Sequence, residues 1–492
     1  MVAHLEGPHH PLLVADATHH IGALPAYQVP FGPSTWALVQ RQVRVFLRNR
    51  EFVISRFVMV LVMGFLYSTS FYQVDSDQIV TVLGVIFTTV LFLALGQLPN
   101  IPSVVEAREI FYKQKSANFF RTSSFILAQC TTQIPFAAAE TVVFGSVMYW
   151  VTGFTANAGA FLTYLLLLFV TNLAFTTWFF FLAAICPNLN VAQPVSMVSV
   201  LFYVLFAGFI MSAADMPDYF VWIYWIDPLA WCIRALAINQ YAAAEFQVCN
   251  YKGIDYCALA GDTFGSAQLK QYGLKTDKAW IWYAVVYLAF SYVFFMLLAY
   301  LALEYIQYDT AEHSVVVQDD EDAEPSKGLD IYAEVPKTPA GAVAVRVHDT
   351  QSQRTTVPVT LAFKDLWYSV PNPTKGEPDL QLLKGINGYA LPGTITALMG
   401  SSGAGKTTLM DVIAGRKTGG KIEGQILLNG YPATDLAIRR STGYCEQMDI
   451  HSESATFREA FQFSAMLRQS DDIPAEEKMA FAEECLELLD MK

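Results

Sequence analysis

The stretch that decides the fold spans residues 394–416 and reads TITALMGSSGAGKTTLMDVIAGR. Its apolar start at 394–399 predicts a buried strand, and residues 406–416 predict a helix. The loop between them has the spacing GxxxxGK[ST], in which glycines let successive backbone N–H groups curl around phosphate at the positive end of a helix. We therefore predict a nucleotide phosphate site, and the candidates are Gly400, Ser401, Ser402, Gly403, Ala404, Gly405, Lys406, Thr407 and Thr408.

Side chains in and around this loop predict ATP and Mg²⁺ as the cofactors. In such a loop the Lys406 ammonium reaches the β and γ phosphates and the Thr407 hydroxyl reaches Mg²⁺. Tyr368 is a candidate for stacking on adenine, or is an aromatic residue of a strand core. Gln447 is a candidate catalytic and Mg²⁺-contacting residue, or lies in a surface turn. Thr456 and Glu459 form a capping-box pattern that predicts a helix running to about residue 467.

Upstream of this region the sequence predicts a membrane domain. Of the 492 residues 54% are hydrophobic and only 15% are charged, against roughly 25% in soluble domains. Apolar segments of about 18 or more residues can cross a bilayer as helices. Six segments qualify: 57–74, 79–101, 130–154, 159–185, 191–211 and 280–303. Helices buried in a large soluble core are the alternative, which six such segments with almost no polar face disfavour.

Loop charges predict the orientation of these helices. The arginines before the first segment indicate a cytosolic N-terminus, and loop 102–124 is basic again after an acidic first turn. Six crossings then return the chain to the cytosol, where an ATP site must lie. The net charge of −13 argues against nucleic acid as a partner. Glu140, an acid inside a predicted span, marks a functional site, lies near one end of the helix, or belongs to a satisfied pair.

The remaining segments predict loops and linkers. Residues 1–35 are irregular, and their His9–His10 and His19–His20 pairs fit a tail better than a metal site. In loop 102–124 a helical stretch at 106–115 would contact a nucleotide-binding domain or lie at the headgroups. The outer segment 212–279 begins with an aromatic stretch, 216–231, that predicts an interfacial or re-entrant helix. We favour a disulfide between Cys249 and Cys257 over two free thiols.

These residues together resemble a known family. GSSGAGKTTLMDVIAGRKTGG at 400–420, IEGQILLNG at 422–430 and GYCEQMDIHSESATFREA at 443–460 resemble the second nucleotide-binding domain of full-size G-subfamily ABC transporters of the pleiotropic drug resistance type. YWVTGF at 149–154 and WIYWIDPLAWCIRALAINQ at 222–240 resemble the membrane domain of the same family. The resemblance begins at about residue 35.

The resemblance implies roles for the candidate residues. It makes Gly400–Thr408 the Walker A motif, Gln447 the Q-loop residue that links nucleotide state to the membrane helices, and Tyr368 the adenine-stacking aromatic. It implies a partial chain, because the signature motif, the Walker B strand and the catalytic glutamate do not follow before residue 492. A second nucleotide-binding domain and a second membrane domain would then be the partners, beside membrane lipid and a hydrophobic substrate.

We therefore expect a multi-domain chain. Its fold class is an all-α polytopic membrane domain with about six transmembrane helices, followed by an incomplete α/β P-loop NTPase domain of ABC type. The expected boundaries are 1–35 for the irregular segment, 36–307 for the membrane domain, 308–357 for an acidic linker and 358–492 for the nucleotide-binding part. The expected function is ATP-driven export of hydrophobic small molecules or lipids by the complete protein, across the plasma membrane. A truncated membrane protein that does not transport is the alternative.

Overall fold

The computed structural model describes residues 25–75, 79–211, 216–252, 254–306, 308, 358–372, 378–401, 403–417, 419–445 and 451–491. They divide into two compact units. The membrane unit holds the described residues of 25–308 and 444–491, and the sheet unit holds those of 358–443. The histidine pairs, the acidic linker up to residue 357, Ser402 and Gln447 lie outside the described residues.

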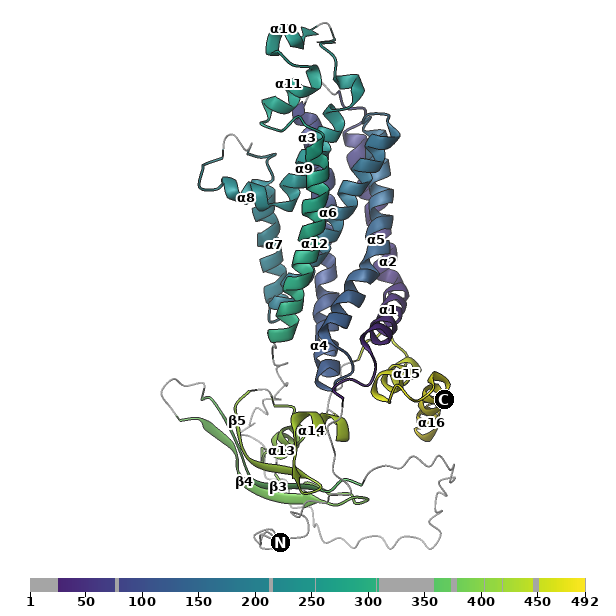
Figure 1. Cartoon of the computed structure of the whole chain (residues 1–492), viewed down its shortest axis with the longest axis vertical. Helices are drawn as coiled ribbons and strands as arrows, with labels where there is room; N and C mark the ends of the chain where they lie inside the picture. Colours follow the sequence, from purple (N-terminus) through teal and green to yellow (C-terminus); the bar gives the residue numbers. More distant parts are fainter. Residues whose placement is uncertain are drawn as a thin grey trace, which may run out of the picture. The chain divides into compact units, whose positions relative to one another are not determined.

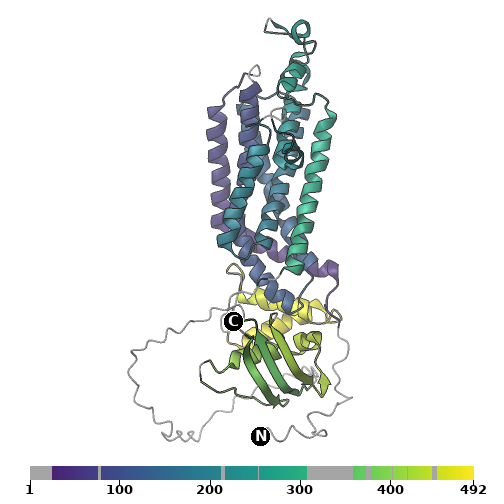
Figure 2. The ribbon, with the colours of Figure 1, turned by 90° about the vertical axis from the view of Figure 1, so that its left-hand side faces the viewer.

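The membrane unit is a bundle of long helices with shorter ones at both ends (Figures 1 and 2). The elements are α1 (Phe31–Arg48), α2 (Arg50–Ser70), α3 (Ile79–Leu95), η3 (Leu98–Asn100), α4 (Ile101–Ser116), α5 (Thr122–Val151), α6 (Ala158–Ile185), α7 (Leu189–Phe206), α8 (Val221–Ile226), α9 (Pro228–Tyr241), η4 (Ala244–Phe246), β1 (Asn250–Tyr251), β2 (Ile254–Asp255), α10 (Tyr256–Ala260), α11 (Phe264–Gln271), α12 (Ala279–Tyr305), α15 (Phe457–Arg468) and α16 (Ala475–Leu488).

Six of the helical stretches in the described residues are long and apolar enough to cross a membrane, as predicted. They are α2, the stretch Ile79–Ser116 that joins α3 to α4, α5, α6, α7 and α12. Two begin seven or more residues earlier than predicted, and the other four begin within two residues of the predicted start. The first begins at Arg50 and the third at Thr122, because helix geometry continues through the polar residues that flank each apolar run.

Polar side chains at the breaks explain where several helices begin. Asn49 separates α1 from α2, and its side-chain oxygen accepts the Phe52 backbone N–H at 3.3 Å. Asn188 and Asp227 do the same for α7 and α9, which satisfies N–H groups that have no partner within the helix. The expectation that residues 1–35 are irregular is wrong for 31–35. Those residues form the first turn of α1, where Pro33 is tolerated because no helical N–H is needed there.

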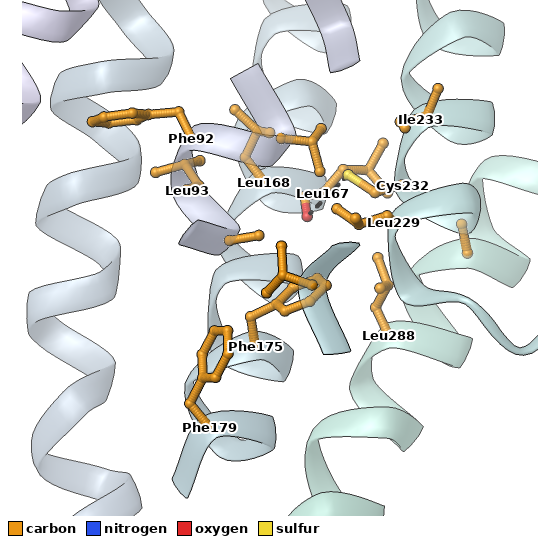
Figure 3. Close-up of a cluster of buried hydrophobic side chains, with 14 of the residues drawn as sticks. Phe92, Leu93, Leu167, Leu168, Phe175, Phe179, Leu229, Cys232, Ile233 and Leu288 are labelled. Atoms are coloured by element: carbon orange, nitrogen blue, oxygen red, sulfur yellow. Dashed lines mark hydrogen bonds between the residues drawn. The ribbon is translucent and has the colours of Figure 1, made fainter. Parts of the chain in front are cut away.

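The core of the membrane unit surrounds α6. Figure 3 shows side chains of four helices meeting there: Phe92 and Leu93 of α3, Leu167, Leu168, Phe175 and Phe179 of α6, Leu229, Cys232 and Ile233 of α9, and Leu288 of α12. By contrast, much of α2, α7 and α12 faces outward with exposed apolar side chains. In water such faces would be unfavourable, so they are the surfaces expected to meet lipid or another membrane domain.

The end of the bundle that carries α10 and α11 also holds a disulfide, so we call it the disulfide end (Figure 1). Cys249 and Cys257 are bonded, with their Cα atoms 5.0 Å apart, which confirms the predicted pairing. The aromatic stretch 216–231 contains two short helices, α8 and the start of α9, which break at Asp227–Pro228. Both helices are too short to cross a membrane, as predicted, and their interfacial or re-entrant position stays a prediction.

The sheet unit contains one antiparallel sheet of four strands in the order β4-β3-β5-β6. Its elements are β3 (Leu361–Val370), β4 (Leu380–Ala390), α13 (Lys406–Ile413), β5 (Lys421–Leu428), β6 (Tyr431–Pro432) and α14 (Asp435–Ser441). Leu366, Tyr368 and Leu383 from the sheet pack against Leu409 and Val412 of α13. This small core holds the phosphate-loop helix against the sheet.

The strand expected at 394–399 is not formed. Residues 395–400 adopt no regular secondary structure, and the side chains of Ile395 and Met399 are 101% and 87% exposed. A buried parallel strand needs strands or helices over both faces, and the strands described in this unit pair only with one another. The apolar run therefore has the composition of a core strand but no neighbour that buries it.

Candidate nucleotide-binding site

The predicted phosphate loop is a tight turn that leads into α13. Gly403 and Gly405 have φ angles of +78° and +79°, which L-residues rarely adopt. Gly405 also precedes the first residue of α13 directly, so the loop ends at the positive end of a helix. A Cβ atom at Gly400 would lie 3.4 Å from the Ala404 Cβ atom, so the turn is closely packed there. The backbone thus provides the glycine geometry that phosphate binding requires.

The Lys406 ammonium lies over this loop. Its Nζ atom donates to the carbonyl oxygens of Gly400 at 2.9 Å and Ser401 at 2.6 Å. A lysine held across the mouth of the loop can exchange those carbonyls for phosphate oxygens. Thr407 is exposed in the first turn of α13, and Thr408 follows it as a half-buried residue. The described donors therefore fit a nucleotide phosphate chain with its magnesium ion.

The adjacent aromatic residues Trp367 and Tyr368 of β3 lie in different environments. Tyr368 is only 4% exposed, packs in the core of the sheet unit and donates its hydroxyl to the Gly419 carbonyl at 2.9 Å. Trp367 is 40% exposed. In this structure Tyr368 thus has the environment of a strand-core aromatic, and the neighbouring indole presents the accessible ring.

Within the membrane unit, helix α15 contacts α1 through an ion pair that was not predicted from the sequence. Arg48, at the end of α1, donates to both carboxylate oxygens of Glu459, at 2.5 and 2.8 Å. The same carboxylate closes the predicted capping box with Thr456, which is confirmed. Hydrogen bonds from Arg48 and from the Thr456 backbone lower the pKa of Glu459 to about 2. The carboxylate is therefore charged throughout the physiological range.

Aromatic packing adds to this contact. The ring of Phe463 in α15 stacks on Phe119, which follows α4, with 6.2 Å between centroids. The Arg41 guanidinium of α1 lies 4.4 Å from the Phe463 centroid. Helix α4 is in turn held by Arg108, which is buried and donates to the carbonyls of Ala183 and Pro187 at 2.8 Å. A continuous set of contacts thus joins α15 to α1 and α4 and, through α4, to the end of α6.

A second feature, which the sequence showed only as the isolated acid Glu140, lies among the spans. Glu140 of α5 is buried and pairs with Arg56 of α2, which is also buried. Gln97 and Asn172 donate to the same carboxylate, at 3.2 and 3.3 Å. The acid therefore belongs to a satisfied pair, which was one of the two predicted alternatives to a functional site.

Comparisons with known protein families account for most of the chain. Residues 33–241 match the family described as ABC-2 type transporter, and residues 383–492 match ABC transporter. Between them, residues 258–316 match plant PDR ABC transporter associated. The first match covers the helices from α1 to α9, and the second covers the phosphate loop and α15.

Individual relatives give the same result. ABC transporter G family member 2 of Dictyostelium discoideum is 31% identical, over 97% of this chain and 36% of its own length. Pleiotropic drug resistance protein 1 of Nicotiana tabacum is 30% identical, over 92% of this chain and 32% of its own length. ABC transporter G family member 48 of Oryza sativa subsp. japonica is 31% identical, over 94% and 33%. The chain thus spans about a third of the length of these relatives.

Proposed function

Because the chain belongs to the ABC transporters of the G family, we propose that it binds MgATP at residues 400–408 and takes part in ATP-driven export of hydrophobic compounds across a membrane. The observation that carries the proposal is the phosphate loop. Two glycines with positive φ lead into α13, and the Lys406 ammonium lies over the loop carbonyls. This geometry, beside six apolar helices in one chain, is what a transporter driven by ATP needs.

Each residue of the loop has a defined task in this proposal. The backbone N–H groups and the start of α13 would hold the phosphates. Lys406 would exchange its two carbonyl acceptors for β and γ phosphate oxygens, and the Thr407 hydroxyl would ligate Mg²⁺. Gln447 would meet Mg²⁺ or the attacking water. For the adenine we propose the aromatic pair at the end of β3. The exposed ring of Trp367 can stack on adenine where it lies, whereas the ring of Tyr368 would first have to leave the core of the sheet unit.

Hydrolysis and transport need parts from elsewhere in the family's architecture. We propose that a second nucleotide-binding domain supplies the signature that completes the ATP sandwich and that a second membrane domain supplies the other wall of the substrate path. The outward apolar faces of α2, α7 and α12 are the available surfaces for that partner and for lipid. We also propose a cytosolic N-terminus and phosphate loop and a plasma-membrane location, on the basis of the basic residues before α2.

Helix α15 offers a route from nucleotide to membrane. Gln447 lies nine residues before Thr456, the residue that caps α15. The contacts of Glu459 with Arg48 and of Phe463 with Phe119 join α15 to α1 and α4. We propose that a change at Gln447 on ATP binding moves α15 and that these contacts transmit the movement to the spans.

Nucleotide binding can be tested with Lys406→Ala in the full chain. Losing its charge-assisted bonds should weaken binding of trinitrophenyl-ATP with Mg²⁺ about tenfold to a hundredfold. Fluorescence of the detergent-purified protein measures this affinity, and alkaline extraction of membranes checks that insertion is unchanged. Lys421→Ala is the matched control, because Lys421 is an exposed lysine of the same unit. Equal binding by wild type and Lys406→Ala, or equal loss in the control, would refute the site.

A further inference from the structure

Arg234 of α9 is buried in a box of aromatic rings at the disulfide end of the membrane unit. Its guanidinium carbon lies 4.6 Å from the ring centroid of Tyr224, 4.4 Å from Trp225, 4.7 Å from Trp231 and 5.7 Å from Trp280. The rings come from α8, α9 and the first turn of α12. The arginine itself is only 2% exposed. A cation over aromatic faces is stabilised by the ring quadrupoles.

The aromatic box leaves most of the arginine's hydrogen-bonding capacity unused. The Nε atom donates to the Tyr224 hydroxyl at 3.2 Å. Both terminal nitrogens are buried and have no acceptor within the described chain. No hydrogen bond to Asp227 is found among the described residues. One oxygen of that carboxylate caps α9 by accepting the Leu229 N–H at 2.8 Å, and the other is buried without a partner there. A guanidinium has five donors in one plane, and ring faces cannot accept donors that point along that plane.

A buried charge with unpaired donors is unfavourable, so this arrangement suits a ligand that brings the missing acceptors. The two terminal nitrogens form a fork that matches two oxygens of a phosphate or carboxylate. Trp225 is the ring of the box that is most exposed to the outside, at 38%. A rotation of that side chain would open the guanidinium to an incoming oxyanion.

The surroundings indicate where such an oxyanion would come from. The segments that form the box also carry exposed aromatic side chains, or follow them directly: Tyr219, Trp222, Trp282 and Tyr283, at 70%, 59%, 61% and 56% exposure. Trp and Tyr concentrate at the membrane–water interface. Phospholipid headgroups occupy that level and carry phosphate. A lipid phosphate is therefore the oxyanion present at the depth of the box.

We propose that Arg234 and its aromatic box bind the phosphate of a phospholipid headgroup at the disulfide end, with Trp225 as the movable side. Lipid binding at this site requires neither nucleotide nor transport, so it can be tested independently of nucleotide binding at the phosphate loop. The bound lipid would tie α8 and α9 to the start of α12 through one anion. Neither the family matches nor the relatives' names assign a role to this position.

The test counts lipid on the purified full chain. Native mass spectrometry in detergent follows titration with dioctanoyl phosphatidylcholine, with dioctanoylglycerol and with inorganic phosphate as separate probes. We expect saturable binding of phosphatidylcholine that Arg234→Gln weakens by about tenfold or more. Lys252→Gln should bind as wild type does, because Lys252 is an exposed cation at the same end that already pairs with Asp75.

Three outcomes would overturn the proposal. Equal binding of dioctanoylglycerol would show that the headgroup phosphate is not recognised, and competition by inorganic phosphate at equal concentration would show a free-anion site. An equal loss in Arg234→Gln and Lys252→Gln would show non-specific attraction. If Arg234→Gln does not fold, Arg234→Lys replaces it, because it keeps the charge but lacks the fork. It should lose affinity severalfold, and unchanged affinity would refute the bidentate site.

Discussion

The buried ion pair of Arg56 and Glu140 allows us to predict how much one conservative substitution lowers the free energy of unfolding. Glu140→Gln keeps the shape of the side chain but removes the charge that faces Arg56. The arginine is 5% exposed, and one of its terminal nitrogens already lacks a partner among the described residues. The change therefore leaves a buried cation without a counter-ion. Breaking a buried pair from one side costs about 3–5 kcal/mol.

This cost should appear as a large fall in thermal stability. At about 2–4 °C per kcal/mol the loss corresponds to a drop in Tm of about 6–20 °C. The assay is thermal unfolding of the full chain in one detergent, followed by the fraction that remains monodisperse after heating. Glu106→Gln, an exposed acid of α4, is the matched control and should leave Tm within about 1 °C, as surface changes usually do.

A double-mutant cycle with the single variants Arg56→Met and Glu140→Leu and their combination isolates the interaction between the two residues. Replacing both partners with apolar residues, Arg56→Met with Glu140→Leu, should recover most of the loss, because a buried ion pair and an apolar pair of similar volume are close in free energy. A Glu140→Gln protein as stable as wild type would refute the reasoning. So would a double variant that loses the sum of the two single losses, because the residues would then act independently.

Two further predictions concern other contacts of the membrane unit. The bound carboxylate of Glu459 has its pKa lowered to about 2. Its contribution to holding α15 against α1 is therefore complete above the ordinary glutamate pKa near 4.5 and is lost as pH falls from there towards 2. Hydrogen exchange of α15 amides at successive pH values measures this, and Arg48→Gln should weaken the dependence, leaving the part that comes from the Thr456 cap. Reducing the Cys249–Cys257 bond opens a short loop and should lower the free energy of unfolding by about 2.5 kcal/mol. A reductant should therefore lower the Tm of the wild-type protein. It should leave the Tm of a Cys249→Ser/Cys257→Ser protein unchanged.

Much of the architecture could be predicted because its signals are local. An apolar run either is or is not long enough to cross a bilayer, so six spans could be counted. The phosphate loop could be located because its glycines and lysine are consecutive. The capping box of Thr456 and Glu459 was predicted for the same reason.

What could not be predicted depends on partners distant in sequence. Glu459 and Arg48 are 411 positions apart, and nothing local marks either as a member of a pair. Because Arg56 is charged, the apolar segment predicted from the sequence begins only after it. Arg56 nevertheless lies inside the bundle, because Glu140 neutralises its charge there. The strand expected at 394–399 failed for the opposite reason. Its apolar composition can be read from the sequence, but a core strand forms only where other strands or helices cover it, and here its side chains are exposed.

The stretch Ile79–Ser116, in which α3, η3 and α4 follow one another, also has a mechanical consequence. At 1.5 Å per residue it spans about 57 Å, roughly twice the thickness of a hydrocarbon core. If α3 and α4 move as one body, the stretch acts as a lever. A tilt of about 10° around its midpoint would displace each end by about 5 Å. The short 3₁₀ turn at Leu98–Asn100 contains Pro99 and lies near that midpoint. If α3 and α4 do not move together, the stretch would bend at this turn.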